Sequence, residues 1–262
     1  MTRLQTRPVE DSGDIRRFFD DIAASYQEAH GSAAQLLTYR LALIRRLLGG
    51  KVGGTLVEIG CGTGSHLFPM ADAFTRVIGT DLSPSMIAAA ERNRQTHPCA
   101  ARIELHPDPA ERLASVEDGV ADAVLCVGAL EHMPDKAAVL RQVQRVLKAG
   151  ARFVCLTPNG DYLWYRRIAP LLGYDVRHLS SDRFVNVTEL RVLLQDAGLM
   201  PGTVGYWRFV PGGDMPRCSA LVMQGMDRVG AVFKPRVLRG GLYACANKDF
   251  IAIGDARADR GE

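Results

Sequence analysis

The feature that most constrains the fold of this chain is a glycine-rich turn between a short apolar run and a helical one. Residues 57–66 read V-E-I-G-C-G-T-G-S-H, so three glycines stand at alternate positions directly after a run typical of a buried strand. Glycine lets the backbone turn sharply and lets a ligand approach without meeting a Cβ. A helix that begins after such a turn presents free N–H groups to polar ligand atoms. The turn therefore predicts a strand–turn–helix unit that binds a cofactor.

Short apolar runs alternate with helical patterns along most of the chain. This alternation predicts right-handed βαβ units and a mostly parallel sheet. Several runs are apolar throughout, as in strands that helices cover on both faces. We expect strands at 55–59, 76–79, 102–105, 121–127, 152–156, 203–210 and 242–247. We expect helices at 65–73, 84–94, 110–116, 136–147, 188–197 and 218–232.

The domain organisation follows from where this alternation of strands and helices begins and ends. We expect a single domain over residues 14–253, with flexible ends at 1–13 and 254–262. Apolar residues at helical spacing over 14–48 predict an N-terminal helical cap of two helices. Residues 159–182 are too long for an ordinary loop of an α/β unit, so we expect a lid or substrate-binding insertion there.

Composition and charge exclude several classes of protein. Hydrophobic residues make up 47% and charged residues 23% of the 262 residues, which excludes global disorder. The formal net charge of only +3 argues against a dedicated nucleic-acid surface. No apolar run approaches the ~20 residues of a membrane span, and no signal peptide is recognisable, so we expect a cytoplasmic protein. The six cysteines match no zinc pattern, so we expect reduced thiols and no metal site.

The glycine turn, with its preceding acidic residue, resembles that of the class I S-adenosylmethionine-dependent methyltransferases, particularly the small-molecule branch. A dinucleotide site would instead need G-x-G-x-x-G, whose sixth position is Ser65 here. The resemblance covers about residues 19–248. It implies a Rossmann-like, seven-stranded, mostly parallel sheet with an antiparallel last strand and helices on both faces. It also implies contacts from the turn to the methionine part and ribose of the cofactor, through Glu58, Gly60, Cys61, Gly62 and Gly64.

A second match is the phrase G-T-D-L-S-P-S-M-I at residues 79–87. Its Asp81 stands at a predicted strand end, and a carboxylate there can accept two hydrogen bonds from a ribose diol. The resemblance implies this ribose role, and it places Leu82 and Met86 at the border of the adenine. A helix cap or an Asx turn before Pro84 is the structural alternative for Asp81.

Two matches are less regular. The family often has D-A-E-x-L after its third strand, where the acidic residue meets the adenine amino group, but residues 107–113 read P-D-P-A-E-R-L. Either Asp108 contacts adenine or the register is shifted by one, and a helix cap is the alternative. Residues 19–26 resemble a family phrase F-D-x-x-A-x-x-Y whose tyrosine closes over the cofactor. This implies a lid role for Tyr26, with core packing as the alternative.

The fourth match, residues 122–135, resembles the family's fourth strand and the loop after it. There the backbone from Val127 to Leu130 would pass the amino-acid part of the cofactor. His132 is the candidate general base, because imidazole titrates near ~6.5 and some family members use a histidine here. A loop histidine that only shapes the pocket is the alternative.

Together these matches predict methyl transfer from S-adenosylmethionine to oxygen, nitrogen or carbon of a small metabolite or natural product, with S-adenosylhomocysteine as the product. Aromatic residues in and beyond the insertion indicate an apolar or planar acceptor: Tyr162, Trp164, Tyr165, Tyr174, Trp207 and Phe209. A DNA substrate is not expected, because no N-P-P-Y base-flipping motif occurs. A non-catalytic cofactor-binding protein, an RNA methyltransferase and an NAD-dependent oxidoreductase stay open as alternatives, and the sequence does not set the oligomeric state.

Overall fold

The sheet of this protein has the strand order β3-β2-β1-β4-β5-β7-β6 in a computed structural model that describes residues 6–24, 33–50, 53–173, 175–207 and 236–249. Strand β7 is antiparallel to β5 and β6, and the other neighbours are parallel. The Rossmann-like sheet with an antiparallel last strand is therefore confirmed. The strands are β1 (Thr55–Ile59), β2 (Arg76–Asp81), β3 (Ile103–Pro107), β4 (Ala121–Val127), β5 (Leu147–Pro158), β6 (Leu199–Trp207) and β7 (Gly241–Lys248).

Helices cover both faces of the sheet because alternate residues of a strand point to opposite sides. On β1, Val57 and Ile59 pack in a core cluster with residues of α4 (Lys136–Val146) and α6 (Val187–Asp196). Leu56 packs in a second cluster with residues of α2 (Ala33–Leu48). Full burial of each such side chain contributes about 1.5–3 kcal/mol, so the buried central strands anchor the fold.

Two predicted α-helices are wrong. Residues 65–73 form turns followed by the 3-10 helix η1 (Phe68–Ala73), and residues 110–116 form turns. In the second segment Leu113 has a φ of 44°, which is incompatible with an α-helix. The carboxylate of Asp108 accepts from both the amide and the hydroxyl of Ser115, so side-chain bonds replace those of a helix.

The remaining helices lie close to their predicted positions. Helix α3 spans Pro84–Gln95, and α1 spans Ser12–Ile22. The insertion contains the π-helix η4 (Trp164–Ile168) and α5 (Ala169–Leu171). The predicted helix at 218–232 and the predicted tail at 254–262 lie outside the described residues.

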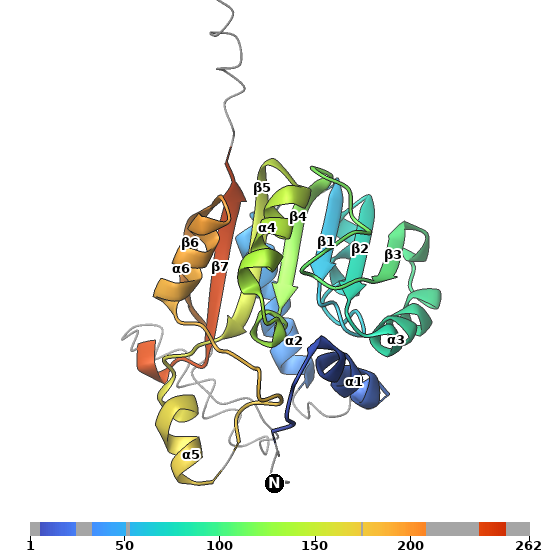
Figure 1. Cartoon of the computed structure of the whole chain (residues 1–262). Helices are drawn as coiled ribbons and strands as arrows, with labels where there is room; N and C mark the ends of the chain where they lie inside the picture. The colour runs from blue at the N-terminus through green and yellow to red at the C-terminus, as the bar shows by residue number, and fades with distance from the viewer. Residues whose placement is uncertain (1–5, 25–32, 51–52, 174, 208–235, 250–262) are drawn as a thin grey trace, which may run out of the picture.

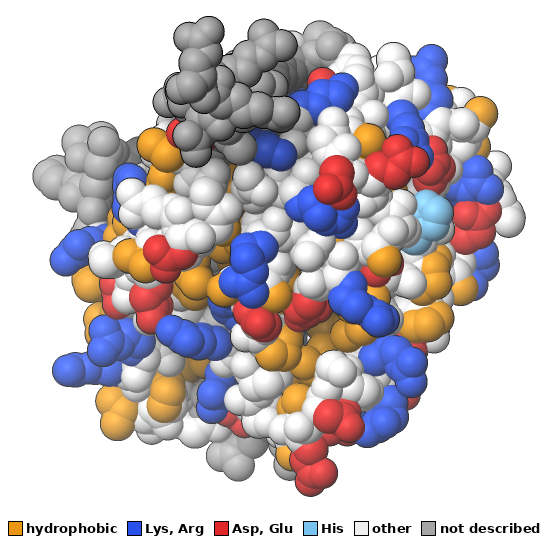
Figure 2. Space-filling model, turned by 45° about the horizontal axis from the view of Figure 1, so that its top comes forward, with side chains coloured by type: hydrophobic (Ala, Val, Ile, Leu, Met, Phe, Trp, Pro, Cys, Tyr) orange, Lys and Arg blue, Asp and Glu red, His pale blue; other side chains and the backbone are white. Residues whose placement is uncertain are grey.

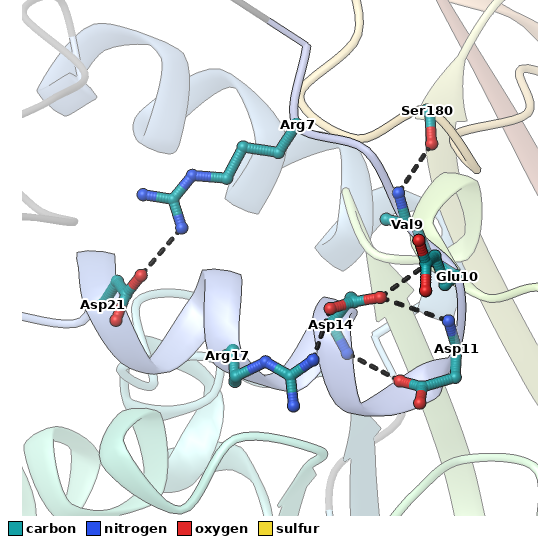
Figure 3. A network of polar contacts seen from close by, with 8 residues as sticks. All are labelled: Arg7, Val9, Glu10, Asp11, Asp14, Arg17, Asp21 and Ser180. Atoms are coloured by element: carbon teal, nitrogen blue, oxygen red, sulfur yellow. Dashed lines mark hydrogen bonds and ion pairs between the residues drawn. The ribbon is translucent and has the colours of Figure 1, made fainter.

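The N-terminal segment differs from the expected flexible end. Arg7 forms a β-bridge with Leu179, in which the Arg7 amide donates to His178 O at 2.9 Å and the Ser180 amide donates to Arg7 O at 2.8 Å. Figure 3 shows the further bond from the Val9 amide to Ser180 Oγ, at 2.8 Å, and the capping box of Asp11 and Asp14 that begins α1. Ordered chain therefore begins before residue 13 and holds α1 against the end of the insertion.

Figure 1 shows α1, α5 and the short helix η5 (Arg236–Leu238) at the lower edge of the sheet, where the parallel strands end. Ligands of open α/β sheets bind at this edge. On the face in Figure 2, basic and acidic side chains are interspersed without a large region of one sign. No helix within the described ranges is long and apolar enough to cross a membrane.

Candidate active site

The glycine turn after β1 packs directly against the loop that follows β4. Gly60, Gly62 and Gly64 have φ values of 65°, 53° and 85°, a region that side chains other than glycine rarely adopt. A Cβ added to Gly60 would lie only 2.5 Å from the Cβ of Ala129. The predicted turn and the predicted segment Val127–Leu130 therefore meet at one place, and glycine is required for that contact.

Asp81 lies at the end of β2 with its carboxylate beside this turn. Its Oδ2 accepts from the Gly62 amide at 2.8 Å, and its Oδ1 accepts from the Ser83 amide at 2.9 Å. Burial raises the pKa of Asp81 and outweighs these two hydrogen bonds, which lower it. The cap of α3 is Ser83, whose hydroxyl accepts from the Met86 amide at 3.0 Å. Each oxygen of Asp81 keeps a lone pair that can accept from a ligand hydroxyl.

Glu58, on β1, is fully buried, and neither of its carboxylate oxygens has a hydrogen-bond partner. His66 Nδ1 lies 3.7 Å from Glu58 Oε1, and His66 Nε2 also lacks a hydrogen bond. Burial, helped by Asp81, raises the pKa of Glu58 well above its ordinary value, while burial lowers that of His66 to about 3. Unsatisfied buried polar groups are rare, so these atoms fit a ligand that brings its own donors.

The residues expected around adenine lie next to Asp81. The amide of Asp108 donates to Asp81 O at 2.9 Å, which joins the ends of β2 and β3. One carboxylate oxygen of Asp108 accepts both bonds from Ser115, each 2.7 Å long. Met86 is buried and Leu82 half-buried in the same region. The structure therefore brings these predicted residues together, and an adenine contact from Asp108 stays a prediction.

His132, in the 3-10 helix η3 (Leu130–His132), forms an ion pair that the sequence did not reveal. Its Nδ1 lies 2.7 Å from Asp182 Oδ1, and the other oxygen of Asp182 accepts from the amides of His178 and Leu179. Burial lowers the pKa of His132, but the bond to Asp182 and the charge of Glu131 outweigh burial, and the net effect raises it. An Nδ1–H bonded to Asp182 leaves Nε2 as the basic nitrogen.

Helix α1 covers this histidine. The ring of Phe19 meets the His132 ring edge-on at 5.2 Å, and Asp20 accepts from the Ser83 hydroxyl at 2.5 Å and from the Ser85 amide at 3.1 Å. Helix α1 therefore contacts both His132 and the loop between β2 and α3, which follows Asp81. Tyr26, the predicted lid residue, lies outside the described residues.

A pocket at the carboxyl ends of β4 and β5 lies next to the glycine turn. Its walls include Arg40, Gly128, Glu131, Thr157, Tyr165 and Trp207. Glu131 is only 6% exposed and accepts from the Thr157 hydroxyl at 3.1 Å. His132 is not among the lining residues. Tyr165 comes from η4, so the predicted insertion does supply a wall of this pocket.

Arg40, on α2, is a second residue that the sequence did not reveal. Its guanidinium lies 5.4 Å from the Trp207 ring centre, and a Cβ on Gly128 would lie 3.9 Å from its Nη2. Its charge also lowers the pKa of His66. The site thus holds a cation, Arg40, close to Gly128 and Trp207 and near enough to His66 to affect its charge.

Cys61 is buried, and burial together with the Asp81 and Glu58 charges raises its thiol pKa well above the ordinary value. It lies in the turn as predicted and stays a neutral thiol. Within the part of the chain that the structure describes, no three histidine, cysteine or acidic side chains lie close enough together to hold a metal ion.

Comparisons with known proteins agree with this geometry. A family model described as "Methyltransferase domain" matches residues 57–155. A ubiquinone biosynthesis O-methyltransferase of Acinetobacter baumannii is 27% identical over 191 residues, 69% of this chain and 79% of that protein. A demethylmenaquinone methyltransferase of Bacillus licheniformis is 29% identical over 181 residues, 61% of this chain and 75% of that protein.

A solved structure shows the same fold at lower identity. The geranyl diphosphate C-methyltransferase of Streptomyces coelicolor A3(2) superposes with a TM-score of 0.65 at 17% identity, over 90% of this chain and 97% of that one. Sheet order, glycine turn and relatives agree: residues 57–155 match a methyltransferase domain, and the chain is similar to the class I S-adenosylmethionine-dependent methyltransferases.

Proposed function

We propose that this protein transfers a methyl group from S-adenosylmethionine to a small-molecule acceptor held in the pocket beside Glu131 and Tyr165, and releases S-adenosylhomocysteine. The observation that carries the proposal is the buried carboxylate of Glu58, without a hydrogen-bond partner, beside the glycine turn and Asp81. The named relatives, whose names refer to ubiquinone biosynthesis and demethylmenaquinone, support a small organic acceptor.

Different residues of the site bind different parts of the cofactor. Glu58 meets the ammonium group and Arg40 the carboxylate of the methionine part, close to Gly60, Cys61, Gly62, Gly64 and Val127. Asp81 accepts from the ribose hydroxyls, and Leu82, Met86 and Asp108 border the adenine. Bound S-adenosylmethionine supplies a methyl group that its sulfonium charge has already activated, so the protein mainly aligns the reactants and excludes water.

The pocket and its neighbours serve the acceptor. Tyr165 and Trp207 line the pocket and suit an apolar or planar molecule, and Glu131, with Thr157, can hold a polar group of it. His132 follows Glu131 but does not line this pocket, so we propose it as the general base for a proton relayed from the acceptor, with Asp182 fixing the imidazole through Nδ1. The domain over residues 14–253, its insertion at 159–182 and a cytoplasmic location belong to the same proposal.

Acceptor-dependent formation of S-adenosylhomocysteine tests the proposal. The full chain is incubated with S-adenosylmethionine carrying a labelled methyl group and a panel of phenols, quinols and amines. We expect label in at least one planar acceptor, and loss of transfer in Glu131→Gln with S-adenosylhomocysteine binding retained. Binding of S-adenosylhomocysteine without transfer to any acceptor would instead support the non-catalytic alternative.

A further inference from the structure

Exposed large apolar side chains gather at one end of this molecule. Among the described residues, eight large apolar side chains are exposed, and five of these eight lie in two short segments. Ile168, Leu171 and Leu172, around α5, are 37%, 85% and 57% exposed, and Val237 and Leu238, in η5, are 47% and 38% exposed. Single exposed apolar residues are ordinary, but a group of them marks an interaction surface. We call these five residues the apolar patch.

Both segments of the apolar patch border the proposed acceptor pocket. Tyr165, one turn before α5, and Gly240, two residues after η5, line that pocket. The side-chain amide of Asn159 donates to Arg236 O at 3.0 Å and to Arg239 O at 2.8 Å, which ties η5 to the start of the insertion. Figure 1 shows both segments at the lower left, beyond the end of β5. The patch therefore surrounds the pocket instead of lying at an unrelated site.

The three residues around α5 share one face. Residues three and four apart on a helical turn are neighbours, so Ile168, Leu171 and Leu172 project on the same side. Two tyrosines of the segment pack against each other: Tyr162 is only 4% exposed, and its ring meets that of Tyr165 edge-on at 4.9 Å. The outward face is thus aliphatic, whereas the centres of protein–protein interfaces are enriched in aromatic residues.

Exposed arginines flank the apolar patch. They are Arg166, Arg167, Arg177 and Arg236. The acidic residues of the insertion balance them only in part: Asp161 pairs with Arg166 at 3.4 Å and Asp175 interacts with Arg177, but Asp182 is buried against His132. An aliphatic face bordered by arginines is the composition of segments that lie in the headgroup region of anionic membranes.

We propose that the apolar patch and its flanking arginines dock this protein on an anionic membrane surface, with the acceptor pocket open toward the lipid. The apolar side chains enter the headgroup boundary and the arginines meet lipid phosphates. Docking stands independently of the catalytic assignment. The corollary, that the acceptor is a lipid-soluble molecule entering from the membrane, rests on the proposed function.

Vesicle co-sedimentation of the full chain tests the docking. Vesicles of phosphatidylcholine alone are compared with vesicles that also contain phosphatidylglycerol, at low and high salt. The test variants are Leu171→Glu with Leu172→Glu, and Arg166→Gln with Arg167→Gln. The matched control is Val192→Glu with Met200→Glu, which adds the same charge at exposed apolar residues outside the patch. Trp164, half-buried in η4, offers a second readout through quenching by brominated lipid.

We expect the unaltered chain and the control to bind the anionic vesicles, more weakly at high salt. The leucine variant loses at least tenfold in apparent affinity. Each removed arginine costs on the order of fivefold and reduces the preference for phosphatidylglycerol. Failure of the unaltered chain to bind, or an equal loss in the control, contradicts the proposal. So does self-association by light scattering that the leucine variant abolishes, because the patch would then join two copies of the chain.

Calorimetric binding of S-adenosylhomocysteine separates this proposal from the proposed function. We expect every vesicle variant to bind it as the unaltered chain does, which also shows that the variants are folded. If the unaltered chain binds vesicles but no adenosyl compound, docking holds and the catalytic assignment fails. If it binds the adenosyl compound but no vesicle, the cofactor assignment holds and the docking proposal fails.

Discussion

At the scale of single residues, the site contains two carboxylates, the half-buried Asp81 and the fully buried Glu58, that differ in their hydrogen-bond partners. Asp81 accepts from two backbone amides, whereas Glu58 accepts from none. A buried charge without a partner is costly, so burial raises the pKa of Glu58 well above its ordinary value, and a cationic ligand group would favour the charged form. Its burial is therefore a cost to stability that serves binding.

Glu58→Gln tests this trade-off. Because folding raises the pKa of Glu58, its contribution to stability is complete below the ordinary value of 4.5 and declines as the pH rises toward the folded pKa. At neutral pH the variant should melt about 2–4 °C higher without ligand, as expected for ~1 kcal/mol, and bind S-adenosylhomocysteine at least ~10-fold more weakly. Thermal unfolding over a pH series measures the first effect. An unchanged melting temperature at every pH would show that Glu58 is not strained.

Gly60→Ala tests the contact between the glycine turn and the loop after β4. The added Cβ would lie 2.5 Å from Ala129, at a φ of +65°. Gly119→Ala is the control, because Gly119 has a φ of +62° with nothing within 4 Å of the added Cβ. Each substitution should lower the free energy of unfolding by about 1 kcal/mol, because alanine is unfavourable in the left-handed backbone region. Only Gly60→Ala should also lose cofactor binding, measured by calorimetry. Equal behaviour of the two variants would remove the steric argument.

Asp182→Asn tests the support of His132. Only neutral imidazole can accept a proton, so the rate rises with pH through the raised pKa of His132. Removing the charge of Asp182 should lower that pKa, move the rise to lower pH and reduce kcat by about tenfold or more. In a His132→Ala background the same change should leave the pH profile unaltered. A profile that does not move in the single variant would leave Asp182 a structural role only.

At the scale of elements, the N-terminal segment and α1 together cover the site. The segment bonds to residues 178–180 through backbone groups, and α1 bonds to the β2–α3 loop through Asp20. Two elements distant in sequence are thus held together above His132.

Arg7→Pro tests whether the backbone bonds of the N-terminal segment hold α1 in place. Proline removes the amide that donates to His178 O, whereas Arg7→Ala keeps that amide and removes the ion pair with Asp21, at 2.7 Å, and the contact of the guanidinium with the Phe18 ring, at 5.3 Å. Loss of the backbone bond should cost about 0.5–1.5 kcal/mol locally and speed hydrogen exchange in α1 and residues 178–182. The alanine variant should exchange as the unaltered chain does, because exposed ion pairs contribute little. Equal exchange in all three proteins would show that the bridge does not hold α1.

At the scale of the whole molecule, the sequence predicted what depends on neighbours in the chain. Strand β4 was predicted to the residue, and Asp81 lies at the end of β2 as predicted, because its motif is local to one strand end; its binding role stays a prediction. Arg40 and Asp182 were missed as site residues, because only the folded chain brings α2 and the end of the insertion to the loop after β4. The helix predicted at 110–116 failed for a related reason, since Asp108 takes the bonds that a helix needs.

The measurement that tests the central claim most directly is calorimetric binding of S-adenosylmethionine, S-adenosylhomocysteine and NADH to the full chain. Asp81→Ala serves as the site variant and Asp72→Ala, an exposed residue of η1, as the control. We predict that both adenosyl compounds bind and NADH does not, that Asp81→Ala loses the binding, and that Asp72→Ala keeps it. Binding of NADH alone, or adenosyl binding that Asp81→Ala leaves intact, would contradict the assignment of this site.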